Sequence, residues 1–322
     1  MWFIFALIAT LGWGFADLFY KKGADEDDGM SHLKTAVWVG LVMGIVAIIL
    51  IPFAETDFTV KSFFVSAVKY SPASLCYIIS MVIGYAGLRY LELSIISPVQ
   101  NGSGALSTIV MIIWFTAIGK ISSIGEEFSA LDIIGTVIIA CGVIALAVVE
   151  QRLSKNGITQ TEKKENKKYI TGALALLFPI LYCLFDTIGT AADGIILDEE
   201  TGLGLGEKDV LILYGLTFML MGIIAWFYML IRNKKAYNPF AKSERSKGAA
   251  AVCEEFGQIF YVYAMAAKPM LAAPMIASYC IVSVILSRIF LKEKLKASQY
   301  ACVITVIIGI VMLGISEGIA EA

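Results

Sequence analysis

Ten apolar stretches, each about as long as a membrane-spanning helix, constrain the fold of this chain more than any other feature of its sequence. A helix needs about 20 mostly apolar residues to cross a bilayer. Hydrophobic residues make up 58% of the 322 residues, more than a soluble core of that length can bury. The sequence therefore predicts an all-α integral membrane protein with ten transmembrane helices in the lipid bilayer. The stretches lie at residues 2–20, 35–54, 70–90, 94–118, 129–149, 169–189, 209–231, 249–267, 271–291 and 297–316.

A polar, basic connecting loop at residues 150–168 divides these helices into two sets of five. Residues 1–149 and 169–322 are therefore predicted to form two repeats. GFAD at 14–17 matches CLFD at 183–186, and 125–146 aligns with 292–313. A repeat with an odd number of helices must insert upside down relative to its predecessor, and such inverted repeats usually build a transport site at their interface.

The distribution of basic residues favours one orientation in the membrane. Of the 25 Lys and Arg residues, 20 lie in the loops after the odd-numbered helices and five lie in the other loops. Because cytosolic loops carry an excess of Lys and Arg, we expect a multi-pass protein of the plasma membrane with the odd-numbered loops in the cytosol and both termini outside. This loop location explains the basic residues without a nucleic-acid partner.

These features resemble the EamA-like ten-helix proteins of the drug/metabolite transporter superfamily. The resemblance lies in the two five-helix units, in Pro98 and Pro274 at the starts of helices 4 and 9, and in turns at Glu126 and Glu293 that lead into glycine-containing helices 5 and 10. It implies a carrier of small metabolites, often an exporter of amino acids or related compounds, with a central cavity lined by helices 1, 3, 4, 6, 8 and 9. It also implies cytosolic termini, opposite to the charge pattern, so the orientation stays open.

Glu254 and Glu255 stand side by side in the apolar stretch 249–267. An ionised carboxylate in the middle of a transmembrane helix costs about 2.5–3.5 kcal/mol, which favours a function for these residues. Glu254, Gln258 and Tyr261 follow the spacing i, i+4, i+7 and form one polar stripe, which we expect to face a cavity. The alternative is that the helix begins a turn later, so that both glutamates form ion pairs at headgroup level.

Further charged residues join these glutamates as candidates for binding substrate or protons. Helices 1 and 3 end, and helix 8 begins, at the same membrane face. This predicts a cluster of Asp17, Arg89, Glu254 and Glu255. Like charges and partial burial would let at least one carboxyl bind and release a proton near neutral pH; the same charges could instead pair with a cationic group of a substrate. Asp186, which matches Asp17 in the second repeat, is expected toward the opposite face. A surface ion pair for Asp17 and a snorkelling anchor for Arg89 are the alternatives.

Aromatic and amide side chains are the candidates for the cavity wall. Aromatic rings could stack on an organic substrate, although they also pack between helices. Gln100 and Asn101 follow Pro98 in helix 4, where a cavity role and interhelical hydrogen bonding are both open. The aromatic candidates are Trp13, Tyr77, Tyr85, Tyr182, Tyr261 and Tyr279.

The sequence has no motif for a metal, a cofactor or an enzyme reaction. The six cysteines lie in apolar stretches without a C-x-x-C pair, and the single histidine, His32, has no second histidine with which to share a metal. No G-x-S-x-G elbow or other nucleophile motif accompanies the two glutamates.

Together these observations predict a secondary-active carrier of a small organic metabolite, with proton-coupled export by alternating access as the expected mechanism. The acidic residues favour an amino acid-like, zwitterionic or cationic substrate, because a phosphate would require basic residues deep in the helices. The alternatives are a permease of the same fold that takes up a sugar or another metabolite, an intramembrane enzyme, and a scaffold that does not transport. Monomer and homodimer both stay open.

Overall fold

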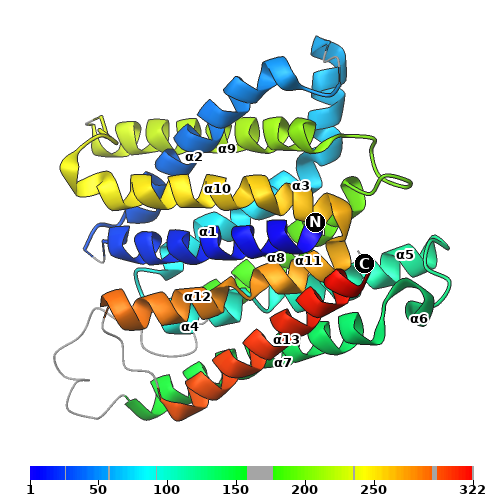
Figure 1. Cartoon of the computed structure of the whole chain (residues 1–322). Helices are drawn as coiled ribbons and strands as arrows, with labels where there is room; N and C mark the ends of the chain where they lie inside the picture. Colours follow the sequence, from blue (N-terminus) through cyan, green and yellow to red (C-terminus); the bar gives the residue numbers. More distant parts are fainter. Residues whose placement is uncertain are drawn as a thin grey trace.

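The computed structural model of this chain describes residues 1–25, 27–56, 59–91, 93–157, 177–234, 236–291 and 296–320. Every regular element in these residues is a helix (Figure 1). Within them, eight helical segments are long and apolar enough to cross a membrane. The chain is therefore an all-helical, multi-pass membrane protein.

The helices of the described residues follow in chain order. Before residue 158 they are α1 (Trp2–Gly23), α2 (Ser31–Leu50), η1 (Ile51–Phe53), α3 (Val60–Gly87), α4 (Leu93–Gln100), α5 (Ser103–Ala117), α6 (Ile124–Glu127) and α7 (Ala130–Gly157). After residue 176 they are α8 (Leu177–Ile196), α9 (Glu207–Asn233), η3 (Lys242–Glu244), α10 (Arg245–Ala267), α11 (Pro269–Ala277), α12 (Tyr279–Leu286), η4 (Ser287–Leu291) and α13 (Ala297–Ala320).

Several helices extend beyond the apolar stretches that predict them. α7 continues to Gly157, so residues 150–157 of the predicted connecting loop 150–168 are helical, and residues 158–168 lie outside the described residues. α3 begins at Val60 rather than at residue 70, because Thr59 and Ser62 form a capping box at its start. The main-chain nitrogen of Ser62 donates to Thr59 Oγ1 at 3.1 Å, and that of Thr59 donates to Ser62 Oγ at 2.8 Å. α8 continues to Ile196 rather than ending at residue 189. Its extra turns accommodate Asp193, whose carboxyl accepts a hydrogen bond from Tyr70 at 2.9 Å.

The predicted fourth and ninth helices are each interrupted near the middle. α4 gives way to α5 at residues 101–102, and α11 gives way to α12 at Ser278. Each break follows a proline, Pro98 inside α4 and Pro274 inside α11, as expected for a residue that removes a helical hydrogen bond. Since α5 packs against α11 and α12 against α4, the two broken helices cross inside the bundle.

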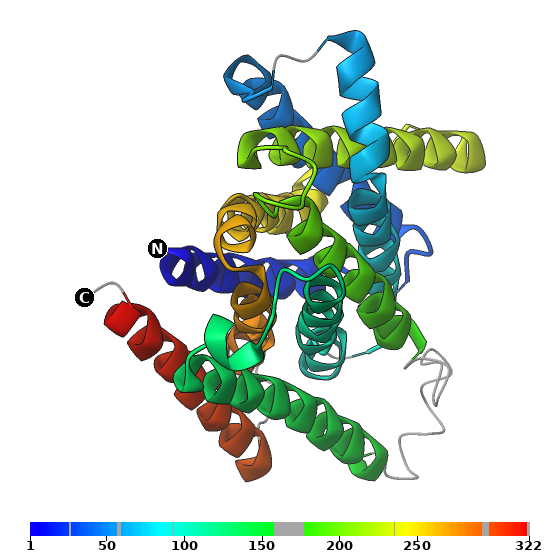
Figure 2. The same ribbon diagram turned by 90° about the vertical axis from the view of Figure 1, so that its right-hand side faces the viewer.

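Four pairs of helices make the most extensive contacts: α2 with α9, α1 with α10, α7 with α13, and α3 with α8. Glycine allows the first pair to approach closely, since a Cβ atom at Gly40 would lie 2.4 Å from the carbonyl oxygen of Phe218 and 2.9 Å from the Cα atom of Gly222. Figure 2 shows α7 and α13 as a crossed pair at one edge of the bundle. α1, α7, α8 and α10 all contact the broken helices.

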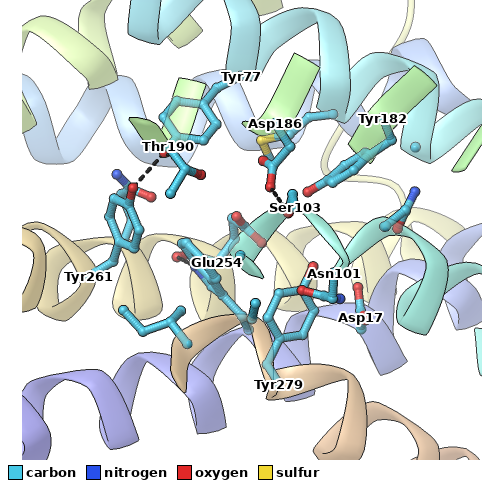
Figure 3. Close-up of a pocket in the computed structure, with 18 of the residues that line it drawn as sticks. Asp17, Tyr77, Asn101, Ser103, Tyr182, Asp186, Thr190, Glu254, Tyr261 and Tyr279 are labelled. Carbon is cyan, nitrogen blue, oxygen red and sulfur yellow. Dashed lines mark hydrogen bonds between the residues drawn. The ribbon is translucent and has the colours of Figure 1, made fainter. Parts of the chain in front are cut away.

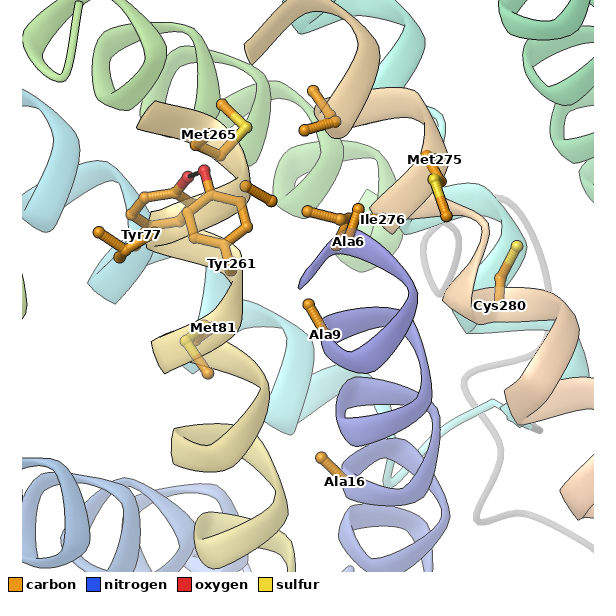
Figure 4. Packing of buried hydrophobic residues seen from close by; sticks show 14 of the residues in the cluster. Ala6, Ala9, Ala16, Tyr77, Met81, Tyr261, Met265, Met275, Ile276 and Cys280 are labelled. Carbon is orange, nitrogen blue, oxygen red and sulfur yellow. Dashed lines mark hydrogen bonds between the residues drawn. The ribbon is translucent and has the colours of Figure 1, made fainter. Parts of the chain in front are cut away.

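Large apolar side chains cover the outer surface, whereas the interior combines large side chains with small ones that let the helices approach. Large apolar side chains project outward from most helices, as at Ile304, Val311 and Ile315 of α13, which are 57%, 53% and 51% exposed. Small side chains such as Ala6 and Ala9 of α1 pack in the interior (Figure 4). This arrangement suits a protein that is surrounded by lipid and packed tightly inside.

Candidate functional site

A polar cavity lies at the centre of the bundle, where the broken helices meet α1, α3, α8 and α10 (Figure 3). Its volume is about 60 Å³, which leaves room for about four to six water molecules at about 10–15 Å³ each. The cavity is therefore sized for a small solute. It is lined by Trp13, Asp17, Tyr20, Tyr77, Met81, Gly84, Tyr85, Leu88, Gln100, Asn101, Ser103, Gly104, Tyr182, Asp186, Thr190, Tyr214, Glu254, Gln258, Tyr261, Ala273, Ile276, Ala277 and Tyr279.

Three carboxyl groups line this cavity, from Asp17 of α1, Asp186 of α8 and Glu254 of α10. α10 begins at Arg245, so Glu254 lies about 14 Å along the helix axis from that end at 1.5 Å per residue. Only 9% of Glu254 is exposed, so this side chain lies inside the bundle. Among the lining residues that the structure describes there is no Lys or Arg, so the charge that this cavity can carry is acidic.

Serines on both sides of the α4–α5 break bind two of these carboxyls. Ser97 of α4 and Ser283 of α12 donate to Asp17 Oδ2 at 2.6 Å and 2.7 Å. Ser103, the first residue of α5, donates to Asp186 Oδ2 at 2.6 Å. These hydrogen bonds tie α1 to both broken helices and α8 to the second half of one of them.

Aromatic rings form much of the remaining wall. Trp13 stacks on Tyr261 with ring centroids 5.0 Å apart and meets Tyr279 edge-on at 5.7 Å. Its indole nitrogen donates to the main-chain oxygen of Glu254 at 3.2 Å. Such π faces can stack on an organic molecule or attract a cation.

Three hydroxyl groups meet at one side of the cavity, and we name Tyr77, Thr190 and Tyr261 the hydroxyl layer. The oxygens of Tyr77 and Tyr261 are 2.5 Å apart, and Tyr77 donates to Thr190 Oγ1 at 3.1 Å. α10 runs toward the end of the bundle that holds both termini (Figure 1), so Tyr261 lies beyond Glu254 in that direction. The hydroxyl layer thus joins α3, α8 and α10 between the cavity and the terminal end.

All eight residues that the sequence analysis assigns to the cavity wall line this cavity, and so does Gln258. Gln258 is 1% exposed, and its amide nitrogen has no hydrogen-bond partner among the described residues. The eight are Trp13, Tyr77, Tyr85, Gln100, Asn101, Tyr182, Tyr261 and Tyr279.

The predicted cluster of Asp17, Arg89, Glu254 and Glu255 does not form as a unit. Asp17 and Glu254 share the cavity, whereas Arg89 lies in the turn after α3 and its Nε donates to the main-chain oxygen of Asp25 at 3.2 Å. Glu255 is buried but does not line the cavity, because successive residues point 100° apart around a helix.

Asp186 lines the same cavity as Asp17, because both α1 and α8 contact the broken helices at the centre. Pro98 and Pro274 lie in α4 and α11, the first parts of the two broken helices, one turn before the breaks. Glu293 lies outside the described residues.

The polar residues that bind the carboxyls were not among the candidates predicted from the sequence. Ser97 and Ser103 flank the polar run that follows Pro98, and Thr190 lies one turn after Asp186 on the same face of α8, so the spacing held a signal for all three. Ser283 reaches Asp17 from 266 residues away, and no local pattern predicts it.

A second cavity, of about 300 Å³, lies between the end of α5, the connection from α8 to α9 and the start of α11. Lys120 contacts Asp198 there, and its Nζ lies 3.5 Å from Glu200 Oε2. Burial alone would raise the pKa of Asp198, but hydrogen bonds from Lys120 and Thr201 outweigh it and hold this pKa below its ordinary value. This ion pair links the ends of α5 and α8.

Within the described ranges, no group of three or more His, Cys, Asp or Glu side chains is arranged to hold a metal ion. The carboxyls of the central cavity bind serine hydroxyls instead.

The fold and the site define a class: a helical, multi-pass membrane protein with an acidic, aromatic-lined cavity where two broken helices cross. No protein-family model matches the sequence, and no curated protein matches it. A solved structure described only as "Crystal structure of protein" is similar over 98% of this chain and 97% of that chain, with a TM-score of 0.58 and 13% sequence identity. At that identity the similarity concerns the fold alone.

Proposed function

We propose that this chain is a secondary-active carrier of a small organic metabolite, an EamA-like member of the drug/metabolite transporter superfamily. The observation that carries the proposal is the central cavity, in which Asp17, Asp186 and Glu254 project between two discontinuous helices. Transport sites near the membrane midplane are typically built from such helices, and buried ionisable residues in membrane segments mark substrate or ion pathways.

The contact pattern supports ten spans in two inverted five-helix repeats. If α8 repeats α1 and α10 repeats α3, the packing of α1 against α10 has its counterpart in the packing of α8 against α3, and both pairs make extensive contacts. The breaks also correspond, since Gly102 follows Pro98, and Ser278 follows Pro274, at the same spacing of four residues.

The crossing of α7 and α13 agrees with this symmetry. A Cβ atom at Gly135 would lie 3.1 Å from the carbonyl oxygen of Gly309, and one at Gly142 would lie 3.6 Å from that of Cys302. The alignment that pairs Gly142 with Gly309 also pairs Gly135 with Cys302. Each contact therefore maps onto the other, as a two-fold relation between the repeats requires.

The lining of the cavity favours an amino acid-like, zwitterionic or cationic substrate. Carboxyl groups and aromatic faces attract ammonium groups, and no described lining residue is basic. The expected mechanism is proton-coupled export by alternating access: breaking the hydrogen bonds of Asp17 and Asp186 on either side of the α4–α5 break would open the cavity to one side at a time. Uptake of a sugar or another metabolite by the same fold is the alternative.

The same proposal includes an orientation in the plasma membrane. Both termini lie at one end of the bundle (Figure 1), and the basic residues at the ends of α1 and α9 and at the start of α10 lie at the other end. The excess of basic residues favours the cytosol for that other end. Labelling of a single cysteine placed at 152 with a membrane-impermeant maleimide tests this, and labelling from outside intact cells contradicts it.

Flux into liposomes that contain the purified protein tests the proposed function. Radiolabelled alanine, lysine, glucose and glutamate are offered with and without a pH gradient, and the solutes are recovered for chemical analysis. A carrier moves at least one solute unchanged, an enzyme alters it, and a scaffold does neither. Movement of none of the four, with or without the gradient, contradicts the proposal.

Glu254→Gln and Glu255→Gln form a matched pair for this assay. Loss of a charge-assisted contact of about 1.5–3 kcal/mol corresponds to a loss of about 10–150-fold in transport at low substrate concentration. We expect that loss for Glu254→Gln, because Glu254 lines the cavity, and a change of less than threefold or so for Glu255→Gln. Equal effects of the two substitutions contradict the assignment of Glu254.

A further inference from the structure

Asp193 is a buried carboxyl group that the cavity does not use. It is 0% exposed and lies on α8. Its Oδ1 accepts a hydrogen bond from Tyr70 at 2.9 Å, whereas its Oδ2 is buried and has no hydrogen-bond partner among the described residues. An ionised carboxylate here would be cut off from water, with neighbouring phenol hydroxyls as its donors.

The groups that face Asp193 are phenols and not cations. Tyr70 and Tyr77 of α3, Tyr214 of α9 and Tyr261 of α10 are the titratable side chains that interact with it. In the described part of the chain, no Lys or Arg lies within ion-pair distance of Asp193. The neutral acid, which has no net charge to compensate, is therefore the form that this environment accepts.

Asp193 lies directly beyond the hydroxyl layer as seen from the cavity. On α8, Asp186, Thr190 and Asp193 follow the spacing i, i+4, i+7 and share one face. The first two line the cavity and the third does not. On α3 likewise, Tyr77 lines the cavity, and Tyr70, two turns nearer the start of the helix, binds Asp193. The hydroxyl layer thus lies between the carboxyls that line the cavity and the buried carboxyl of Asp193.

We propose that Asp193 is a proton-binding site of the carrier, which exchanges its proton with the terminal end of the bundle, and that the hydroxyl layer of Tyr77, Thr190 and Tyr261 separates this proton from the substrate cavity. The inference rests on the proposed function and adds the residue that couples transport to protons. On release, the Asp193 O–H bond breaks and the proton passes to water; no electron moves.

The position of Asp193 gives the coupling a direction. The site lies nearer the terminal end than the cavity does, because α8 passes Asp186 before it reaches Asp193. With the termini outside, Asp193 takes up a proton from outside and, once the hydroxyl layer opens, releases it to water on the cytosolic side, so that the proton moves down its gradient. Substrate leaving in exchange for that proton is export.

Infrared spectroscopy of the purified protein reads the protonation of Asp193 without a substrate. We expect a C=O stretching band of a protonated carboxylic acid at neutral pH that is missing in Asp193→Asn and shifted in Tyr70→Phe, which keeps the carboxyl but removes its hydrogen bond. Absence of any difference between wild type and Asp193→Asn overturns the proposal. The Tyr70→Phe shift keeps the test decisive where Asp193→Asn fails to fold.

Transport with and without a pH gradient supplies the second measurement, with whichever of alanine, lysine, glucose and glutamate the wild type moves fastest. Asp193→Asn keeps a group that accepts the Tyr70 hydrogen bond but cannot release a proton. We expect it to exchange labelled for unlabelled solute within about twofold of wild type, and to lose accumulation driven by the pH gradient. Gradient-driven accumulation equal to wild type overturns the proposal.

Asp132→Asn is the matched control, because Asp132 is a buried carboxyl at the start of α7, away from both the cavity and the hydroxyl layer. It should keep gradient-driven accumulation, and its loss there as well overturns the specific role of Asp193. If the wild type moves none of the four solutes, the proposed function fails, while the infrared band still decides whether Asp193 holds a proton.

Discussion

Replacing Gly104 with alanine would place a methyl group in a tight contact between α5 and α11. A Cβ atom at Gly104 would lie 2.3 Å from the Cβ atom of Ala277, 2.8 Å from the carbonyl oxygen of Ala273 and 3.2 Å from the Cα atom of Pro274. Carbon atoms pack at about 3.5–4.0 Å, so the two helices would have to separate by more than about 1 Å. Since two of the three neighbours are main-chain atoms, rotation of a side chain cannot relieve the contact.

The magnitude follows from two opposing terms. Overpacking of this kind typically destabilises by about 1–3 kcal/mol, while alanine in place of glycine inside a helix stabilises by up to about 1 kcal/mol. Gly318→Ala supplies the second term alone, because a Cβ atom at Gly318 of α13 meets nothing within 4 Å. The difference between the two variants therefore isolates the clash, at about 1–3 kcal/mol.

Thermal unfolding in detergent, followed by tryptophan fluorescence, measures this difference. At about 2 °C for each kcal/mol in a large domain, the midpoint of Gly104→Ala should lie about 2–6 °C below that of Gly318→Ala. A midpoint equal to or above that of Gly318→Ala would refute the close crossing of α5 and α11, and with it the geometry of this side of the cavity.

Two further predictions concern the ends of the bundle. The pKa of Asp198 is held below its ordinary value by Lys120 and Thr201, so its folded pKa is below its unfolded pKa, and the stability that it contributes is present at neutral pH, starts to fall below about pH 4 and is lost as the pH passes the folded pKa. Asp198→Asn should therefore lower the unfolding free energy by about 0.5–1.5 kcal/mol at pH 7, and its difference from wild type should shrink as the pH falls below about 4; a difference that does not shrink contradicts the ion pair. Removing the α3 cap by Thr59→Ala should cost about 0.5–2 kcal/mol, whereas Thr305→Ala, whose hydroxyl bonds to its own helix, should change stability by less than about 0.5 kcal/mol; equal unfolding midpoints would contradict the capping box.

The hydropathy pattern predicts where the helices lie because a lipid environment requires long apolar runs and internal hydrogen bonding. It fails where a polar residue is satisfied by a distant partner. Asp193 ends the apolar stretch at 169–189 in the sequence, but Tyr70 accommodates it and α8 continues to Ile196. Such contacts across 123 residues leave no local trace.

In the candidate site too, a local sequence pattern identifies some of the residues and leaves others unidentified. Glu254 and Gln258 could be assigned to the cavity because they stand out in an apolar helix at a spacing that shares one face. Arg89 could not be excluded from it, because the sequence does not reveal that the chain turns after α3 and brings the guanidinium group to the main chain near Asp25. Ser283 was missed because a single serine in an apolar helix is too common to indicate a site.

α7 and α13 pair at the edge of the bundle, so facing the lipid and lining the cavity are tasks of different helices. Among the described residues, neither helix contributes a side chain to the central cavity, so their outward faces are free to adapt to the host bilayer. α13 has 24 residues, about 36 Å at 1.5 Å per residue, which exceeds a hydrocarbon layer of about 30 Å and requires the helix to tilt. Exchanging isoleucines on this face for shorter or longer apolar residues would adapt the protein to thinner or thicker membranes without changing the side chains that line the central cavity.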